Sequence, residues 1–545
     1  MIDLLIKKTE SRIKSDPTIC AKALVDSLIE LGVENIFGYP GAAVLSIYQE
    51  LSKVSSIKHY LVRHEQAAVH SAEGYARVSG KPGVVLVTSG PGFTNTVTGI
   101  ANAYADSTPL VILAGDVSSS NNRGKVFQKV DILSITKTCS KKNYILTSKD
   151  DVKQIIKEAY ETANSGEKGP VVVVLPRNIL EVKYSSKISK NIHKKRSQVI
   201  NDIDIEKSIR LINLSKKPLI LVGGGATNSV ENIKQLVAKT NIPVVSTLMG
   251  IGVFPSNSDL YLGMIGINGN SNANLALAES DLILSLGVSY SDRSTCKKYN
   301  FAQNAKIINV NTKKGLLNHD IEICADSNEF LTKLLSKLDI AKDFSDWISY
   351  INYKKEFDLK KKSDSKILQS SFVLETIYEV TQDYEPIVVT DVGQHQLLTA
   401  QYFNFNHPKK FITSGGLGTM GFGLPASIGA QIANKNALVI NITGDGSFQM
   451  NLQELATCRE YNIPIKIIIL NNGYLGMVRQ LQDKIYNNRY QVEMTNPDFT
   501  KIAEAYDLFA IRVSKASELT IALEKMLKHQ GTSILDIAID TMEEI

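Results

Sequence analysis

Short apolar runs alternate with amphipathic stretches of helical length through most of the 545-residue chain. Runs of four to eight apolar residues between helices are typical of parallel strands that are buried on both faces of a sheet. The sequence therefore predicts an α/β fold built from doubly wound parallel sheets. The clearest runs are GVVLVT (83–88), PLVILAG (109–115), VVVVLP (171–176), PLILVGGG (218–225), DLILSLG (281–287), PIVVT (386–390), LVINITG (438–444) and KIIIL (466–470).

Two polar, lysine-rich stretches divide these runs into three groups. They cover residues 183–204 and 358–366 and have the composition of surface linkers. We therefore expect three doubly wound domains, at residues 15–182, 205–340 and 367–545. No short internal repeat is present, although three α/β domains of similar size are compatible with a common ancestor.

Composition and charge narrow the class of protein. The chain has 43% hydrophobic residues, as ordinary globular proteins do, and its formal net charge of +6 is too small to indicate a nucleic-acid partner. Its five cysteines form no CxxC pair, which is typical of reduced thiols in a cytoplasmic protein. No apolar run is long enough to predict a membrane span, and the first residues are too charged for a secretory signal.

Residues 437–477 combine two strand-like runs with an intervening helical stretch. The first run breaks at GDG (444–446), and the second ends at NNG (471–473). A right-handed crossover places two parallel strands side by side, so both breaks are expected at the carboxyl edge of one sheet. Asp445 and Asn472 should therefore face a common site.

The residues at these breaks have the chemistry of a magnesium and diphosphate site. A carboxylate (Asp445), an amide oxygen (Asn472) and a backbone carbonyl such as that of Tyr474 are hard ligands suited to Mg²⁺. The flanking glycines allow close approach of phosphates, and a helix expected from Ser447 to about Tyr461 directs its N-terminus at them. Either break alone would be interpreted as an ordinary turn, whereas the two together favour the metal site.

The motif GDGSFQMNLQELAT (444–457), followed by NNGYLGMVRQ (471–480), resembles the metal and diphosphate motif of thiamine-diphosphate enzymes. In its detail it is similar to the acetolactate synthase catalytic subunits, and the resemblance covers almost the whole chain. It implies a pyrimidine-binding first domain, a central domain that often holds FAD, and a third domain that binds the diphosphate and Mg²⁺. In the third domain it implies cofactor contacts by Gly393, Gln394, His395, Gly418, Met420, Gly444, Gly446, Ser447, Tyr474 and Met477.

The same resemblance implies the catalytic residues of the first domain. Glu65, in the sequence HEQ, matches the glutamate that contacts N1′ of the cofactor's aminopyrimidine. A carboxylic acid shielded from water can protonate N1′, so that the 4′-imino group removes the C2 proton of the thiazolium. A 2-oxoacid then loses CO₂, and the hydroxyethyl unit that remains is ligated to a second 2-oxoacid. Gly41 and Gln128 match further catalytic positions, and Phe127 matches a residue of the substrate pocket.

Acceptor choice is expected to depend on Leu481. The family has a tryptophan in the segment RQWQ that shapes the pocket of the second substrate, whereas this chain has RQLQ. A smaller wall gives less contact with an extra methyl group. The resemblance therefore predicts a preference for pyruvate over 2-oxobutanoate and 2-acetolactate as the main product, in the first common step of branched-chain amino-acid biosynthesis.

Flavin binding is expected to be weak or absent. The central domain keeps Gly223, Gly224 and Gly225, LMG (248–250) and the pair Asp292 and Arg293, but four positions depart from the family pattern. Losing guanidinium groups removes partners for a diphosphate. The departures are Glu167 for Arg, Asn268 for His, Ser289 for Arg, and NVNTK (309–313) for HIDID.

The resemblance also implies an assembly. In this family the first domain of one chain completes the site on the third domain of its partner, which implies a homodimer or a homotetramer. A small regulatory subunit is a further expected partner. The chain ends before the tail that usually covers the active site in the family.

Two other classes of function compete with this interpretation. The glycines of GLGTMG (416–421), followed by a helix, a strand and Asp445, have the pattern of a dinucleotide fingerprint and suggest an NAD-linked dehydrogenase. The position of Asp445 beyond the strand end argues against it. A catalytically silent paralogue is the second class, and intact Glu65, Asp445 and Asn472 argue against that. Another thiamine-diphosphate decarboxylase or carboligase is the remaining alternative.

Overall fold

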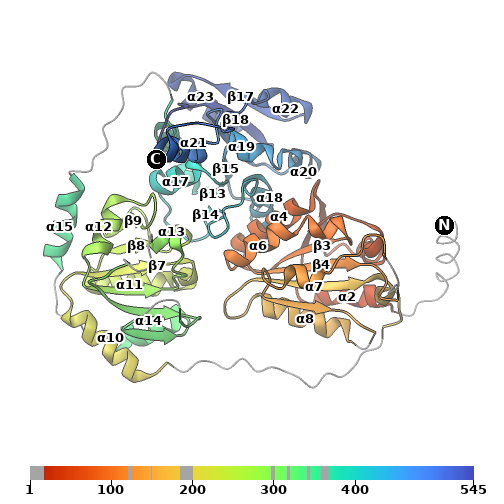
Figure 1. Ribbon diagram of the computed structural model, residues 1–545, viewed down its shortest axis with the longest axis horizontal. Helices are drawn as coiled ribbons and strands as arrows, with labels where there is room; N and C mark the ends of the chain where they lie inside the picture. Colours follow the sequence, from red (N-terminus) through yellow and green to blue (C-terminus); the bar gives the residue numbers. More distant parts are fainter. Residues whose placement is uncertain are drawn as a thin grey trace. The chain divides into compact units, whose positions relative to one another are not determined.

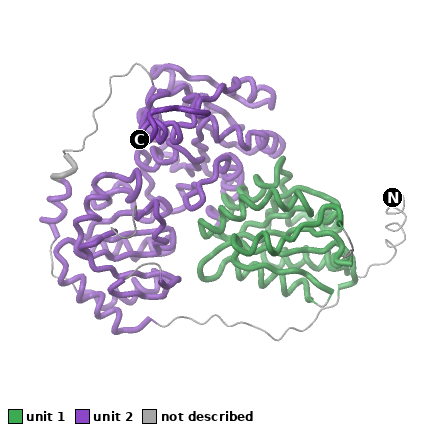
Figure 2. The backbone as a smooth tube through the Cα atoms, viewed as in Figure 1, with its two compact units in different colours: residues 1–76, 80–193 green, residues 77–79, 194–545 purple. Residues whose placement is uncertain are grey.

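The computed structural model describes residues 18–120, 125–148, 150–184, 200–295, 301–315, 319–339, 344–356 and 368–545. It contains three parallel six-stranded sheets flanked by helices, which confirms the predicted α/β fold (Figure 1). The chain divides into two compact units, residues 1–76 with 80–193 and residues 77–79 with 194–545 (Figure 2). The linker at 358–366, residues 185–199 of the other linker, and Cys296 lie outside the described residues. The boundaries 15–182, 205–340 and 367–545 remain predictions.

The first sheet has the strand order β2-β1-β3-β4-β6-β5. Its strands are β1 (Asn35–Gly38), β2 (Lys58–Leu61), β3 (Gly83–Val87), β4 (Leu110–Asp116), β5 (Lys142–Ile145) and β6 (Pro170–Pro176). Its helices are α2 (Cys20–Glu30), α3 (Leu45–Leu51), α4 (Glu65–Ser79), α5 (Pro91–Thr94), α6 (Val97–Ala105), α7 (Ile132–Thr136), α8 (Val152–Ala163) and α9 (Arg177–Leu180).

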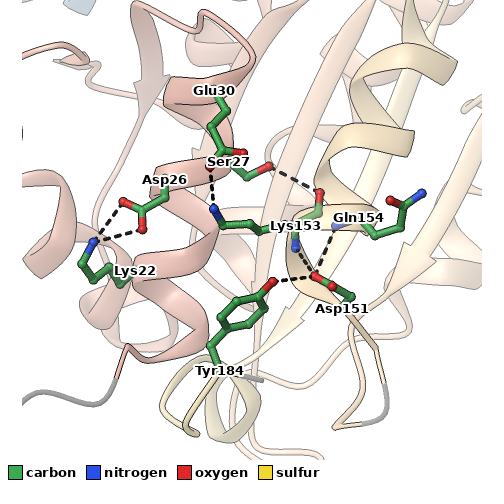
Figure 3. A network of polar contacts seen from close by, with 8 residues as sticks. All are labelled: Lys22, Asp26, Ser27, Glu30, Asp151, Lys153, Gln154 and Tyr184. Atoms are coloured by element: carbon green, nitrogen blue, oxygen red, sulfur yellow. Dashed lines mark hydrogen bonds and ion pairs between the residues drawn. The ribbon is translucent and has the colours of Figure 1, made fainter. Parts of the chain in front are cut away.

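Helices α2 and α8 pack together on this sheet through apolar faces and a polar network. Helix α8 buries Val152, Ile156, Ala159 and Ala163 at helical spacing in the same core as residues of α2. At the surface, Lys153 donates to Glu30 of α2 at 2.6 Å (Figure 3). Asp151 caps α8 and accepts a hydrogen bond from Tyr184 at 3.0 Å. The network links Tyr184 to α8, and α8 to α2.

The central sheet has the strand order β12-β11-β10-β7-β8-β9, which is the 3-2-1-4-5-6 order of dinucleotide-binding folds. Its strands are β7 (Pro218–Val222), β8 (Val244–Ser246), β9 (Tyr261–Met264), β10 (Leu282–Leu286), β11 (Lys306–Asn311) and β12 (Ile321–Cys324). Its helices are α10 (Asp202–Leu214), α11 (Val230–Thr240), α12 (Ser271–Glu279), α13 (Asp292–Thr295), α14 (Ser327–Lys337) and α15 (Ser345–Glu356).

The third sheet, β14-β13-β15-β16-β18-β17, repeats the strand order of the first. Its strands are β13 (Ile387–Thr390), β14 (Phe411–Ile412), β15 (Val439–Gly444), β16 (Lys466–Asn471), β17 (Phe509–Val513) and β18 (Ser533–Ala538). Its helices are α16 (Ser370–Thr381), α17 (Gln394–Tyr402), α18 (Gly423–Ala433), α19 (Asp445–Gln449), α20 (Leu455–Tyr461), α21 (Gly476–Tyr486), α22 (Phe499–Ala505) and α23 (Ala516–Lys528).

Strand order determines where a ligand can bind. In doubly wound sheets the crevice opens at the carboxyl ends of two adjacent strands whose connections leave in opposite directions. That point lies between β13 and β15 in the third sheet and between β1 and β3 in the first. The segments beginning at Gly393 and Asp445, which follow β13 and β15, therefore meet at the expected crevice.

The helix predicted from Ser447 to about Tyr461 is divided in two, so this prediction was wrong. Helix α19 begins at Asp445 and ends before Asn451, and α20 follows after a short 3-10 turn. Asn451 leaves the helical conformation because its Nδ2 donates to the carbonyl of Gly421 at 2.7 Å. Short amide side chains often compete with helices in this way. In the described part of the chain, no helix has the length and apolar character needed to cross a membrane.

Candidate active site

A cavity of about 110 Å³ lies at the carboxyl edge of the third sheet. Its walls come from the segments that follow β13, β15 and β16 and from the start of α21. The structure thus brings together all but one of the cofactor and metal residues predicted for this domain. Those lining the cavity are Gly393, Gln394, His395, Met420, Gly444, Asp445, Gly446, Ser447, Asn472, Tyr474 and Met477.

Asp445 places a buried carboxylate in this cavity, since only 2% of the residue is exposed. Its Oδ2 accepts hydrogen bonds from the backbone N–H of Gly473 at 3.0 Å and from Nδ2 of Asn496 at 2.5 Å. Burial nevertheless raises the pKa of Asp445, while these hydrogen bonds lower it. A bound cation would offset the cost of burying this charge.

Asn472 and Tyr474 follow β16 and lie beside Asp445 in the same cavity. Oδ1 of Asn472 accepts a hydrogen bond from the backbone N–H of Tyr474 at 3.0 Å, and its Nδ2 donates to Oε1 of Gln394 at 3.5 Å. The set of one carboxylate, one amide oxygen and a backbone carbonyl fits a hard cation such as Mg²⁺. Among the described residues, no group of three or more His, Cys, Asp or Glu side chains offers an alternative metal site.

His395 supplies a polar atom that the protein leaves unpaired. Its Nε2 is buried and has no hydrogen-bond partner among the described residues, and the residue lines the cavity. Burial lowers the pKa of His395 to about 4. A buried polar atom without a partner is costly, so a polar ligand group at this position fits the site. Glycines make room for the ring, because a Cβ at Gly393 or Gly444 would lie 3.1 Å from it.

Gly476 lets the start of α21 lie close to the side chain of Gln394. A Cβ at Gly476 would lie only 1.9 Å from Oε1 of Gln394. Gln394 in turn donates through Nε2 to Oε1 of Gln480 at 3.3 Å and to the carbonyl of Glu543 at 3.0 Å. The Gln394 side chain therefore connects α17 with α21 and with the segment at Glu543.

The segment GLGTMG is not arranged as a dinucleotide site. The N–H of Gly421 donates to Oδ1 of Asp391 and the N–H of Gly423 donates to its Oδ2, each at 2.9 Å. The start of α18, where a pyrophosphate would sit, is thus occupied by an internal carboxylate. Asp391 was not predicted from the sequence. Gly418, with a φ of 75°, adopts a left-handed conformation but does not line the cavity.

In the first unit, the predicted catalytic residues gather at the carboxyl edge of the first sheet. Glu65 begins α4, and its Oε2 accepts a hydrogen bond from Nδ2 of Asn95 at 2.9 Å. A Cβ at Gly92 would lie 3.4 Å from Oε1 of Glu65 and 2.6 Å from Thr88. A Cβ at Gly41 would also contact Thr88, at 2.5 Å. Gly41 and Glu65 therefore both lie near Thr88.

Gln128 also lies at this edge of the sheet, where it packs against Gly90. It has a φ of 59°, and a Cβ at Gly90 would lie 2.8 Å from Cβ of Gln128. Phe127, beside it, is 84% exposed, and Leu481 on α21 is 52% exposed without lining the third-sheet cavity. These two predicted pocket residues are thus on the surface of the isolated chain.

Three protein families match this chain in sequence. "Thiamine pyrophosphate enzyme, N-terminal TPP binding domain" matches residues 19–135, the corresponding "central domain" matches residues 205–334, and the "C-terminal TPP binding domain" matches residues 391–537.

Individual relatives match over nearly the whole chain. The acetolactate synthase large subunit of Buchnera aphidicola (Schizaphis graminum) is 40% identical, over 96% of this chain and 95% of its own length. The isozyme 3 large subunit of Escherichia coli is 39% identical over the same shares. The chloroplastic acetolactate synthase of Arabidopsis thaliana is 39% identical, over 96% of this chain and 82% of its own length.

Proposed function

Because the chain belongs to the acetolactate synthase large-subunit family of thiamine-pyrophosphate enzymes, we propose that it decarboxylates pyruvate and ligates the hydroxyethyl unit to a second 2-oxoacid. The preferred product is 2-acetolactate, with 2-aceto-2-hydroxybutanoate as the minor product. The observation that carries this proposal is the cavity at the carboxyl edge of the third sheet. Its lining combines a buried carboxylate, two neutral oxygen atoms suited to ligate a cation, and an imidazole nitrogen without a hydrogen-bond partner.

The third domain is proposed to hold the diphosphate and a magnesium ion. Asp445, Asn472 and the carbonyl of Tyr474 are the proposed ligands of the ion. Gln394 and His395 are proposed to contact the diphosphate, and the support for this is that both line the cavity. When bound, thiamine diphosphate supplies the carbon nucleophile and accepts the electrons released on loss of CO₂.

The first domain is proposed to control a proton at Glu65. Because Asn95 donates to Oε2, this oxygen serves as an acceptor, and Oε1 is the oxygen proposed to exchange a proton with the cofactor. Oε1 faces the segment at Gly92, where the absence of a side chain leaves room. Gly41 and Gln128 are proposed to border the reacting carbons, with Phe127 and Leu481 forming walls of the substrate pocket.

Flavin is not proposed as a requirement. Support comes from the segment NVNTK (309–313), which replaces the acidic segment of the family pattern. Two of its side chains lie in or against the protein core. Asn309 is fully buried within β11, and Nδ2 of Asn311 donates to the carbonyl of Val288 at 2.8 Å. Neither residue is acidic, so neither replaces the carboxylates of the family pattern.

The proposed assembly is a homodimer or a homotetramer in the cytoplasm. Several relatives are named "large subunit", which supports a small subunit as a further partner.

Incubating the purified chain with pyruvate, thiamine diphosphate and Mg²⁺ tests the function directly. Formation of 2-acetolactate, with one CO₂ released per product, is the expected result. Release of CO₂ with acetaldehyde as the only product would instead indicate a simple decarboxylase. Absence of turnover, with and without a small subunit, would indicate a silent paralogue.

A further inference from the structure

Asp445 is one end of a hydrogen-bond chain that runs inward from the cavity. Its Oδ2 accepts a hydrogen bond from Nδ2 of Asn496 at 2.5 Å. The same Nδ2 donates to Oδ1 of Asn471 at 3.0 Å. Nδ2 of Asn471 then donates to Oδ1 of Asp536 at 2.9 Å. Two carboxylates are thus connected through two amide side chains.

The orientation of Asn496 is fully determined by its partners. Its Nδ2 has two hydrogens, and each has an acceptor, on Asp445 and on Asn471. Its Oδ1 accepts a hydrogen bond from Nε2 of Gln449 at 3.0 Å. Gln449 is itself anchored, because the same Nε2 donates to the backbone carbonyl of Asp445 at 3.1 Å. A flip of the Asn496 amide would break all three of its hydrogen bonds.

Asp536, at the inner end of the hydrogen-bond chain, is a buried carboxylate that has no role in the proposed reaction. Asp536 lies on β18 opposite Ile469 of β16 and is fully buried. Arg512 of the edge strand β17 lies 3.4 Å from its Oδ2. Burying a carboxylate in a sheet is costly. By accepting from Asn471, Asp536 forces the oxygen of that amide toward Asn496.

We propose that Asn496 is a positioning residue for the divalent cation, held in orientation by Asn471 and Asp536. Nδ2 of Asn496 and the N–H of Gly473 both donate to Oδ2 of Asp445, so this oxygen is already paired within the protein. Oδ1 is then the oxygen that ligates the cation, and the carboxylate is fixed before the cation arrives. Partners of metal ligands commonly control affinity in this way. The inference rests on the proposed magnesium site.

Binding of Mn²⁺, followed by electron paramagnetic resonance in the presence of thiamine diphosphate, tests the proposal on the full-length chain. Asn496→Ala is expected to weaken Mn²⁺ binding about 10- to 100-fold. Asp536→Asn has nearly the same shape but offers a donor to Asn471, and it is expected to weaken binding by a smaller factor, about 3- to 10-fold. Because only affinity is affected, saturating Mg²⁺ should restore most of kcat in both variants.

Gln431→Ala is the matched control. Gln431 is also a buried amide of the third domain, and its Nε2 donates to three backbone carbonyls in the loop after α18. This variant should lower thermal stability without changing Mn²⁺ affinity. Unchanged affinity in folded Asn496→Ala and Asp536→Asn would overturn the proposal, as would equal weakening in Gln431→Ala. Wild-type protein that binds no Mn²⁺ would instead remove the proposed metal site itself.

Discussion

Asn95 donates a hydrogen bond to Oε2 of Glu65 from the loop that links α5 to α6, across 2.9 Å. Seven residues later, Asn102 donates in the same way to Glu73, also at 2.9 Å. Between these two bonds, Gly99 lets α6 approach α4, because a Cβ there would lie 2.6 Å from Val69. The carboxylate of Glu65 is therefore fixed by the packing of two helices.

Replacing Glu65 removes the group proposed to carry the proton. Glu65→Gln should reduce carboligation about 10²- to 10⁴-fold, because general acid catalysis contributes a factor of that size. Thiamine-diphosphate affinity, measured by calorimetry with Mg²⁺ present, should change little. Asn95→Ala should give a smaller loss of turnover, since the acid remains but its orientation is no longer fixed. Near-wild-type turnover in Glu65→Gln would show that another group handles the proton.

Mixing two inactive variants tests the proposed assembly. Glu65→Gln and Asp445→Ala are each expected to be inactive, but a mixed dimer has one site with both native residues if partner chains share sites. After exchange of subunits at equal amounts, activity should recover to about a quarter of the wild-type value, because half of the dimers are mixed. Sedimentation should show a dimer or tetramer. Absence of recovery in verified mixed dimers would indicate that each chain forms its own site.

A larger side chain at Leu481 should change the acceptor. Leu481→Trp should raise the share of 2-aceto-2-hydroxybutanoate when pyruvate and 2-oxobutanoate compete. One methylene contact contributes about 1–3 kcal/mol, so a change of about tenfold in the product ratio is expected. Ile485→Trp, four residues further along α21 and also exposed, is the control and should leave the ratio unchanged. A wild-type ratio that already favours 2-oxobutanoate would contradict the predicted preference for pyruvate.

Flavin content has a direct measurement. We expect the purified chain to carry less than stoichiometric flavin by absorbance, because Glu167 and Ser289 replace the two arginines that the family resemblance implies as partners of the diphosphate. Activity should also persist after extensive dialysis against flavin-free buffer. Stoichiometric flavin, or activity that returns only when FAD is added back, would contradict this expectation.

Acid should destabilise the first domain through His59. Its Nε2 lies 2.8 Å from the hydroxyl of Tyr48, and burial lowers the pKa of His59 to about 4 from an ordinary value of 6.5. The neutral ring therefore contributes stability above pH 6.5, and this contribution is lost as the pH falls toward 4. The difference in free energy of unfolding between wild type and His59→Gln should shrink over this interval. A difference that is independent of pH would contradict the prediction.

Sequence patterns were sufficient to predict the three sheets and the position of the residues that follow the glycine breaks at their strand ends. Gly393, Asp445 and Asn472 follow strand ends whose apolar runs are easily recognised, and parallel strands place all such ends at one edge. The topology thus predicted which residues meet in the third-sheet cavity without any knowledge of side-chain contacts.

The residues that were missed act from a distance along the chain or through specific contacts. Asn496 lies 51 residues after Asp445 in an irregular segment, where neither periodicity nor turn chemistry indicates a partner. Asp391 was overlooked because its role, accepting from Gly421 and Gly423, depends on the path of a loop 30 residues away. The break at Asn451 has the same origin, since only the position of the Gly421 carbonyl explains it.

The identical strand orders of the first and third sheets bear on the evolutionary history of the chain. A gene duplication produces two such copies, whereas the central sheet, with its different order, would have entered as an insertion between them. Under such a history, one copy carries Glu65, the proposed proton carrier, and the other carries Asp445, the proposed ligand of the cation. Under this history, a crossover that exchanges the first and third domains between homologues should preserve folding but separate two residues that were selected together.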